Sequence, residues 1–470
     1  MTVKRSDASA ASGEGEVTKP PRLAIDATGL MFWPRGKGLA GIPRVESFLV
    51  NAALADPDPC VEVVAFRPWE GRFRPLAPFE QDHVAAGEIS PHRVKCWPGR
   101  RTALSQAFEA ARRQPWGRLD ADRHLAKTVT NGRKGIAYQA TRLLIRAYRL
   151  CQRASVRFGL REDTASEPAE TEQGIMLISH HILTQEDRSA VSGAAGDLAF
   201  LCHDLIPTLR PDLLGTSTSE RRFGSYLEQL VRSGAPAFCA SEEVGATLTE
   251  HMRKAGIAAP VVYRFPMPSI LHAIASRAGT TSRIETDEPF VLYCSTIEVR
   301  KNHILLARVW QQALEDGVKL PRLVCAGRWG WMIEPLRAYL KAHPELLQSV
   351  TFTGLVSDEQ LIQYYRSATF GVFPSHIEGW GYGASECLDF GVPVIVSTAP
   401  SLIEASGGLM PAIDSNDQAG WYAAIRRMAE DHGWRSSLAE RIAKQHRPTP
   451  AAASWAAIKA GLKESASRRL

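Results

Sequence analysis

The feature that most constrains the fold of this chain is the alternation of short β-rich runs with longer stretches of helical periodicity. Such alternation is typical of parallel sheets covered by helices. The strands expected in the first half are Arg22 to Ala27, Val61 to Phe66, Gly174 to Ser179, Asp197 to His203 and Pro236 to Ala240. Those expected in the second half are Phe290 to Cys294, Arg322 to Ala326, Val350 to Gly354, Ala368 to Phe373 and Val392 to Ser397. Two such series predict an α/β protein with two Rossmann-like domains facing each other across a cleft.

A length of 470 residues also exceeds what one ordinary domain needs. We expect a disordered leader over 1–20, a first domain over 21–267, a linker over 268–288, a second domain over 289–447 and a C-terminal segment over 448–470. The linker is rich in Ser, Thr and Ala, and the last segment contains an amphipathic helix from Ala451 to Leu462. Ligands of open α/β sheets bind beyond the carboxyl ends of the strands, so the cleft is where chemistry is expected.

The composition argues against several classes of protein. No apolar run reaches the roughly 18 residues that span a bilayer, and the polar N-terminus lacks the apolar core of a signal peptide. The eight cysteines are scattered without CxxC spacing, which favours a reducing cytosol over a disulfide scaffold. No cluster has the spacing of zinc ligands, so we expect neither a bound metal nor a cofactor. A net charge of +6 is mild, and we expect no nucleic-acid partner.

The most informative segment is a glycine-rich loop between a strand and a helix. Gly379, Gly381 and Gly383 free this loop of side chains, so that a ligand could approach its backbone N–H groups. The helix expected to start near Tyr382 adds the positive end of its dipole, which suits a phosphate.

Two carboxylates bracket this loop. Glu378 precedes it, and Glu386 lies one turn into the helix. An ionised carboxylate only accepts hydrogen bonds, so the pair suits the hydroxyl groups of a sugar. The alternative is a helix N-terminus with two favourably placed acidic residues, because short glycine patterns are weakly diagnostic.

A second loop delivers Arg300 and Lys301 between a strand and a helix. Adjacent cations usually mark a solvated helix start, and that is the alternative for this pair. A helix N-terminus disfavours cations, however, so two of them there are easier to understand if an anion is bound. Arginine can bind a phosphate through two hydrogen bonds, and lysine acts as a point charge.

These motifs resemble glycosyltransferase family 4, a group of retaining enzymes with the GT-B fold. The resemblance is close over about Pro289 to Arg447, and its E-x7-E motif stands as Pro374-Ser375, Glu378-Gly379-Trp380-Gly381, Glu386 and Gly391-Val392-Pro393-Val394-Ile395. It implies that Glu378 contacts the transferred sugar and Glu386 the ribose hydroxyls. It also implies that Arg300 and Lys301 bind the donor diphosphate.

The sequence departs from the family pattern at the wall of this pocket. Tyr382-Gly383 stands where an aliphatic residue and proline are frequent, which alters the wall that Trp380 and Tyr382 would form and therefore the sugar preference. Ser295 and Val299 replace a usual glycine and proline, which is a milder departure.

The stretch from Val350 to Tyr365 resembles the base-binding loop of the family. The resemblance implies that backbone groups of Gly354 and Val356 flank the nucleobase. The alternative is an ordinary strand-to-helix connection with Ser357 as N-cap.

The first half matches the family less well. Pro34 to Val45 is similar to the family's first loop, which closes over donor and acceptor and would here include Gly38, Gly41 and Arg44. The alternative for this segment is a flexible surface loop. Phe200 to Pro207 resembles a strand end of mannosyltransferase-like members. That resemblance places His203 in the cleft near the sugar, next to Asp204, although a lone histidine at a strand end is more often structural.

The resemblance implies a retaining, metal-independent hexosyltransferase that moves a sugar from a nucleotide-diphosphate donor to a glycan or lipid-linked acceptor, in surface polysaccharide assembly. Mannose is preferred on the His203-Asp204 resemblance alone. The main alternative is a non-catalytic GT-B-like protein that binds a nucleotide sugar or acts as a scaffold. Another GT-B enzyme, such as an epimerase, fits the Arg300-Lys301 and E-x7-E combination less well. A dinucleotide oxidoreductase is disfavoured because no G-x-G-x-x-G follows the first strand.

A basic insertion over about 100–161 carries 15 Lys or Arg and three acidic residues. Within it, Ile136 to Phe158 reads as a helix with one cationic face: Arg142, Arg146, Arg149, Arg153 and Arg157. Leu143, Leu144 and Tyr148 help to form an apolar side. Such a helix can lie on an anionic membrane, so we expect a cytoplasmic protein, peripheral on the inner face of a membrane. The alternative is a solvated helix face.

Overall fold

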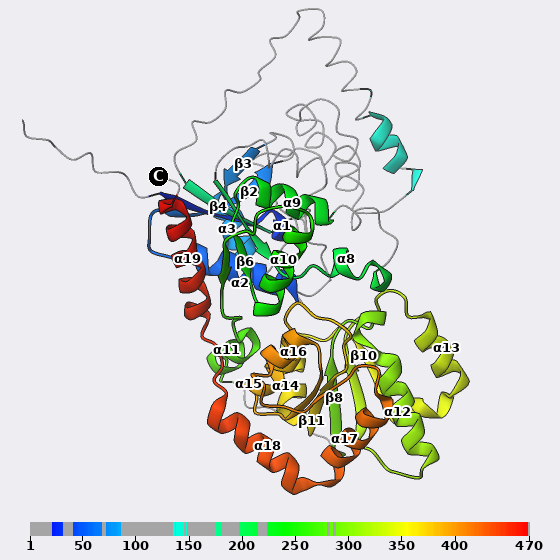
Figure 1. Cartoon of the computed structure of the whole chain (residues 1–470). Helices are drawn as coiled ribbons and strands as arrows, with labels where there is room; N and C mark the ends of the chain where they lie inside the picture. Colours follow the sequence, from blue (N-terminus) through cyan, green and yellow to red (C-terminus); the bar gives the residue numbers. More distant parts are fainter. Residues whose placement is uncertain are drawn as a thin grey trace, which may run out of the picture.

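The computed structural model describes residues 21–31, 41–67, 72–85, 135–136, 138–144, 147, 174–179, 197–214, 223–279, 283–284 and 288–468. These residues form two α/β domains, which lie one above the other in Figure 1. None of the helices in this part of the chain combines the length and the apolar character needed to cross a bilayer. The expected leader, the loop residue Gly38 and most of the basic insertion lie outside the described residues.

The first domain is built on a seven-stranded sheet in the order β3-β2-β1-β4-β5-β6-β7. Its strands are β1 (Arg22–Asp26), β2 (Val61–Arg67), β3 (Arg72–Pro75), β4 (Gly174–Ser179), β5 (Asp197–Cys202), β6 (Ala237–Cys239) and β7 (Val262–Arg264). All neighbours pair in parallel except β2 and β3, which are antiparallel. The sheet is covered by the helices and 3-10 turn α1 (Thr28–Met31), α2 (Ile42–Leu54), α3 (Pro78–Ala85), α8 (Ile206–Leu209), η2 (Pro211–Leu213), α9 (Phe223–Arg232) and α10 (Glu242–Lys254).

The second domain is built on a parallel six-stranded sheet in the order β10-β9-β8-β11-β12-β13. Its strands are β8 (Phe290–Cys294), β9 (Arg322–Ala326), β10 (Val350–Gly354), β11 (Phe370–Phe373), β12 (Val394–Ser397) and β13 (Ala412–Ile413). The strand order reverses direction between β8 and β11, and in doubly wound sheets the crevice at such a switch point is where ligands bind. The loops that follow β8 and β11 therefore lie where a ligand is expected to bind.

The helices of the second domain cover both faces of this sheet. They are α11 (Ile270–Arg277), η4 (Val299–Lys301), α12 (His303–Glu315), α13 (Glu334–Ala342), η5 (Pro344–Gln348), α14 (Asp358–Ser367), α15 (Tyr382–Asp389), α16 (Pro400–Ala405), α17 (Gln418–Glu430) and α18 (His432–Gln445). Strands β8, β11 and β12 are buried almost end to end, because helices cover the sheet on both sides.

The C-terminal helix α19 (Ala451–Ser467) runs back along the first domain (Figure 1). Its apolar residues Trp455, Ile458 and Leu462 belong to the same core as α2 and β1. At its polar side, Lys459 Nζ lies 2.7 Å from Asp56 Oδ1 and Trp455 Nε1 donates to Asp56 Oδ2 at 2.6 Å. The chain thus crosses between the domains twice.

The expected linker over 268–288 contains α11, which packs on the second domain through Leu271 and Ala275. The two crossings are joined at Ser269: its backbone N–H donates to the Thr449 carbonyl at 3.1 Å, and its hydroxyl accepts from the Thr449 N–H at 2.9 Å.

Most of the expected strands are present, several with the predicted ends. Three strands were missed, namely β3, β7 and β13. Strand β3 carries two arginines and a proline, β7 has exposed Val262 and Arg264, and β13 has two residues. Each lies at or beside a sheet edge, where the burial that gives a strand its apolar signature is smallest.

Candidate functional site

The residues singled out from the second half of the sequence meet at the carboxyl ends of β8 and β11, beside the switch point. Arg300 and Lys301 follow β8 in the turn η4, and Glu378 follows β11. The end of β5 in the first domain faces them, because a Cβ atom built on Gly379 would lie 2.2 Å from the carbonyl oxygen of His203. The site therefore lies where the two domains meet.

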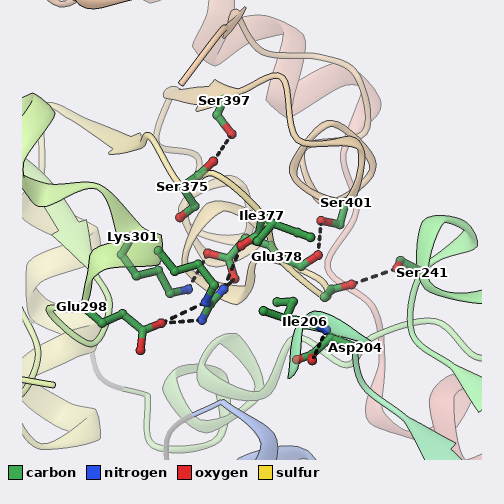
Figure 2. A network of polar contacts seen from close by, with 12 residues as sticks. Asp204, Ile206, Ser241, Glu298, Lys301, Ser375, Ile377, Glu378, Ser397 and Ser401 are labelled. Carbon is green, nitrogen blue, oxygen red and sulfur yellow. Dashed lines mark hydrogen bonds and ion pairs between the residues drawn. The ribbon is translucent and has the colours of Figure 1, made fainter. Parts of the chain in front are cut away.

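Arg300 and Lys301 point at the glycine-rich loop. The Arg300 Nη1 group donates to Glu378 Oε2 at 2.6 Å and to the Ile377 carbonyl at 2.9 Å. On its other side, Arg300 Nη2 lies 2.7 Å from Glu298 Oε1. The Lys301 ammonium is paired with Glu378 Oε1 (Figure 2). Two cations and two carboxylates thus form one buried cluster.

Burial and neighbouring charges shift the pKa values of the residues in this cluster. Burial opposes ionisation of Glu378, but Arg300 and Lys301 outweigh it and lower the pKa of Glu378 to about 2. Burial and the neighbouring Arg300 guanidinium lower the pKa of Lys301 below its ordinary value. Burial also raises the pKa of Asp204, which faces the same cations from the end of β5. The two cations of the cluster are therefore balanced by the carboxylates of Glu298 and Glu378.

Three serine hydroxyls fix the backbone around Glu378. Ser401 Oγ donates to the Glu378 carbonyl at 2.7 Å, and Ser397 Oγ to the Ser375 carbonyl at 2.6 Å. Ser241, at the start of α10 in the first domain, donates to the Gly379 carbonyl at 2.8 Å (Figure 2). The loop is therefore held from both domains.

The glycines of the loop allow close packing of neighbouring protein atoms against its backbone. A side chain on Gly379 would collide with the backbone of His203, and one on Gly383 would lie 2.3 Å from Phe373 Cε1. Gly381 has a φ of 110° and packs against Leu402. Protein atoms occupy the positions that side chains on these glycines would take, and the approach of a ligand to the backbone N–H groups of the loop stays a prediction.

Glu386 is buried on α15 and is held by residues of both domains. Its Oε2 accepts from the Tyr365 hydroxyl at 2.6 Å, and its Oε1 accepts from Arg44 Nη1 at 3.3 Å. Arg44 Nη2 lies 2.5 Å from Asp358 Oδ1. Burial raises the pKa of Glu386 to about 7, although Arg44 and Tyr365 act in the opposite direction.

Trp380 and Tyr382 belong to the second domain but pack against the core of the first. Trp380 Nε1 also donates to Ser385 Oγ at 3.3 Å. A cavity of about 480 Å³ lies beside the domain crossings, lined by Trp380 and Ser385 together with Ser269 and His446. The two aromatic residues thus help to join the domains, and their expected contact with a donor stays a prediction.

The remaining predicted residues belong to both domains. His203 is buried at the end of β5, with Nε2 4.0 Å from Glu46 Oε1 on α2. Gly354 ends β10 with a φ of 72°. Val356 is partly buried and packs against the core of the second domain. Gly41 precedes α2 with a φ of 60°, which leads the chain into the helix that carries Arg44.

The basic helix is described only in part. Residues 136, 138–144 and 147 are helical, and the guanidinium of Arg142 lies over the Tyr138 ring, 5.7 Å from its centroid. Leu143 and Leu144 are exposed. Arg146, Arg149, Arg153 and Arg157 lie outside the described residues.

Sequence reasoning missed the residues that hold the predicted ones. These residues are Glu298, which pairs with Arg300, and Asp358 and Tyr365, which contact Arg44 and Glu386. Asp358 follows the N-cap Ser357, whose side chain and Gln360 form a capping box, so its position already had a local explanation. Its contact with Arg44 spans 314 positions, and no local pattern records a contact of that range.

Comparison with known proteins relates the second domain to a family of enzymes. Residues 288–431 match the family described as Glycosyl transferases group 1. The serotype-specific mannosyltransferase WbdA of Escherichia coli is 26% identical over 231 residues, which is 47% of this chain and 28% of WbdA. The O-antigen chain mannosyltransferase B of Escherichia coli is 31% identical over 153 residues, 32% of this chain and 40% of that protein. The chain therefore spans well under half the length of these relatives.

Solved structures match over nearly the whole chain. Sucrose-phosphate synthase from Thermosynechococcus elongatus has a TM-score of 0.53 at 14% identity, covering 94% of this chain and 97% of the synthase. Anabaena HepE in complex with UDP has a TM-score of 0.52 at 13% identity, covering 94% of this chain and all of HepE. At such low identity these likenesses describe the fold. The chain has the GT-B fold, and residues 288–431 of its second domain match the family of group 1 glycosyl transferases.

Proposed function

We propose that this protein is a hexosyltransferase that takes a sugar from a nucleoside-diphosphate donor and transfers it to a glycan or lipid-linked acceptor. The observation that carries the proposal is the pairing of the partly buried Arg300 and Lys301 with the buried Glu378 beside the switch point. Two cations converge there on a carboxylate that a diphosphate can replace. The nearby Glu386 is suited to accept hydrogen bonds from ribose.

The donor diphosphate takes the place of Glu378 between Arg300 and Lys301, and Glu378 then turns to the sugar hydroxyls. In the transfer step the bond between the anomeric carbon and the phosphate oxygen breaks, and the acceptor oxygen bonds to that carbon. The acceptor proton passes to the leaving phosphate. Because charge grows on that phosphate, cations already in position stabilise the transition state without reorganisation.

We propose in addition that transfer retains the anomeric configuration and requires no metal. Attack from the face of the leaving group is compatible with the phosphate acting as base, and the two cations supply the charge that a metal would otherwise contribute. Mannose from GDP-mannose is the preferred donor, since WbdA and mannosyltransferase B are named as mannosyltransferases. Their names also support an acceptor in surface polysaccharide assembly. The HepE structure contains UDP, so uridine donors belong in the test.

The test is to incubate the protein with GDP-, UDP- and ADP-sugars and to follow release of the nucleoside diphosphate. Transfer or slow hydrolysis of one donor is expected, with an activity loss of at least about tenfold in Glu386→Ala. Binding of a donor without any turnover would favour the scaffold alternative, and neither binding nor turnover across the panel would contradict the proposal.

The basic helix is proposed to hold the protein on the inner, cytoplasmic face of an anionic membrane. Support comes from exposed Ile136, Leu143 and Leu144 in the same helical stretch as Arg142. Binding to anionic liposomes is expected to weaken with salt and in the double variant Arg146→Glu, Arg149→Glu. Equal partitioning of the variant and the wild type would exclude this role.

A further inference from the structure

Arg44 connects the first domain to the part of the site that is expected to hold the nucleotide ribose. We propose that Arg44 is a positioning residue that favours the ionised form of Glu386 and orients it for the ribose hydroxyls of the donor. The inference rests on the proposed function and deepens it, because it assigns part of the nucleotide recognition to the opposite domain.

The Arg44 guanidinium bridges two helices of the second domain. Arg44 reaches Glu386 on α15 with Nη1 at 3.3 Å, and Asp358 on α14 with Nη2 at 2.5 Å. The Arg44 side chain is 11% exposed and that of Glu386 is 3% exposed, so the contact is shielded from water. Ion pairs in such places are much less screened by salt than surface pairs.

The bridge leaves Glu386 unused hydrogen-bonding capacity for a ligand. A carboxylate has about four lone-pair sites. Tyr365 takes one site on Oε2 and Arg44 one on Oε1, so about one site on each oxygen stays available for a ribose hydroxyl. Arg44 therefore acts beside the ribose and does not replace it.

The surroundings of Glu386 explain why it needs a cation. The titratable groups of other elements that interact with Glu386 are Arg44, Asp358, Tyr365 and Cys294. Those of its own helix are Tyr382, Cys387 and Asp389. Arg44 is the one cation among these groups. Burial raises the pKa values of both phenols and both thiols, so they stay neutral near pH 7. Without Arg44, the pKa of Glu386 is expected to rise further above its ordinary value, so a larger fraction of this carboxyl group would be protonated when the donor arrives.

Arg44 also makes this part of the site depend on the domain arrangement. It is the third residue of α2, just after the turn at Gly41, whereas both of its partners belong to the second domain. The ribose position is therefore complete only when the domains are together.

The test compares Arg44→Gln with the wild type by calorimetric titration of GDP and UDP and of their 2′,3′-dideoxy counterparts. We expect the variant to bind the ribonucleotide at least about tenfold more weakly at pH 7 and to lose most of its discrimination against the dideoxy form. Raising the pH to about 9 should restore part of the affinity, since Glu386 then ionises without help. Arg44→Lys, which keeps the charge, should keep the pH dependence of the wild type.

Arg264→Gln is the matched control, because Arg264 also pairs across the domain interface, with Nη2 2.5 Å from Glu404 Oε1. It should bind both nucleotides as the wild type does. If Arg44→Gln binds as tightly as the wild type, or discriminates equally well against the dideoxy forms, the role of Arg44 is excluded. If the wild type binds neither GDP nor UDP, the proposed function itself is contradicted, so the two failures can be told apart.

Discussion

Glu378 and Glu386 are the same type of residue, eight positions apart, yet their environments drive their pKa values in opposite directions. Two cations adjoin Glu378 and lower its pKa to about 2, whereas burial dominates at Glu386 and raises its pKa to about 7. The difference suits two tasks. A carboxylate that is always ionised can hold the cations in readiness, and one poised near neutrality responds to its neighbours.

The depressed pKa of Glu378 predicts how it stabilises the fold at different pH values. Its ordinary pKa of 4.5 falls to about 2 in the folded protein, so its contribution is complete above about pH 4.5 and declines as the pH falls towards about 2. The full contribution is at most about 3 kcal/mol, from the size of the shift. Urea unfolding of wild type and Glu378→Gln should differ by a constant amount from about pH 7 to 5 and by clearly less at pH 3. A difference that stays constant down to pH 3 would contradict the ion-pair geometry.

At this scale the sequence indicated which residues are candidates for the site but not how they pair. Arg300, Lys301, Glu378 and Glu386 could be selected from their motifs. Their mutual contacts could not, because Lys301 and Glu378 are separated by 77 positions and belong to different loops. Arg44 was expected in a closing loop, and its bond to Glu386 became visible only when the two domains were seen together.

At the scale of elements, the loop after β11 is a contact surface as well as a candidate ligand site. Gly379 lies against the backbone of His203, and its carbonyl accepts from Ser241. Periodicity predicted the strand and the helix on either side of this loop, because both are buried in regular patterns. The purpose of the glycines was not predictable, since a pattern of glycines does not say whether a ligand or another domain lies against it.

Gly379→Ala tests this contact surface. The new Cβ would lie 2.2 Å from the carbonyl oxygen of His203. Because this oxygen belongs to the backbone, the clash cannot be relieved by a change of rotamer, and the two domains should be forced apart. We expect donor turnover to fall at least about tenfold with little change in melting temperature, because both domain cores stay intact. Gly433→Ala is the control, since its Cβ would meet only Asp431 Oδ1 at 3.5 Å. Normal turnover in Gly379→Ala would mean that this contact is not needed.

For the whole molecule, the first and last parts of the chain share one core. Helix α19 completes the first domain, and the crossings at Ser269 and Thr449 are bonded to each other. Both crossings also bond to Asp389 at the end of α15, through Ser269 Oγ and His446 Nε2, each at 2.8 Å. The helix that carries Glu386 is thus anchored where the domains are joined, and domain arrangement and donor site are mechanically connected.

The division into two sheets was predictable from the alternation of strands and helices, whereas the closeness of the domains was not. Contacts such as Trp331 Nε1 to the Leu213 carbonyl at 3.0 Å join loops without a regular pattern. Such contacts depend on the shapes of the folded surfaces of the two domains, and local periodicity in the sequence does not record these shapes.

The central claim is that the paired cations between the domains bind the diphosphate of a nucleotide sugar. Its most direct test is calorimetric titration of GDP and UDP into wild type, Lys301→Ala and Lys319→Ala, in which Lys319 is an exposed lysine of the same domain. The account predicts that the wild type and Lys319→Ala bind one nucleotide equally well and that Lys301→Ala binds it at least about tenfold more weakly. Equal affinity in all three proteins would contradict it.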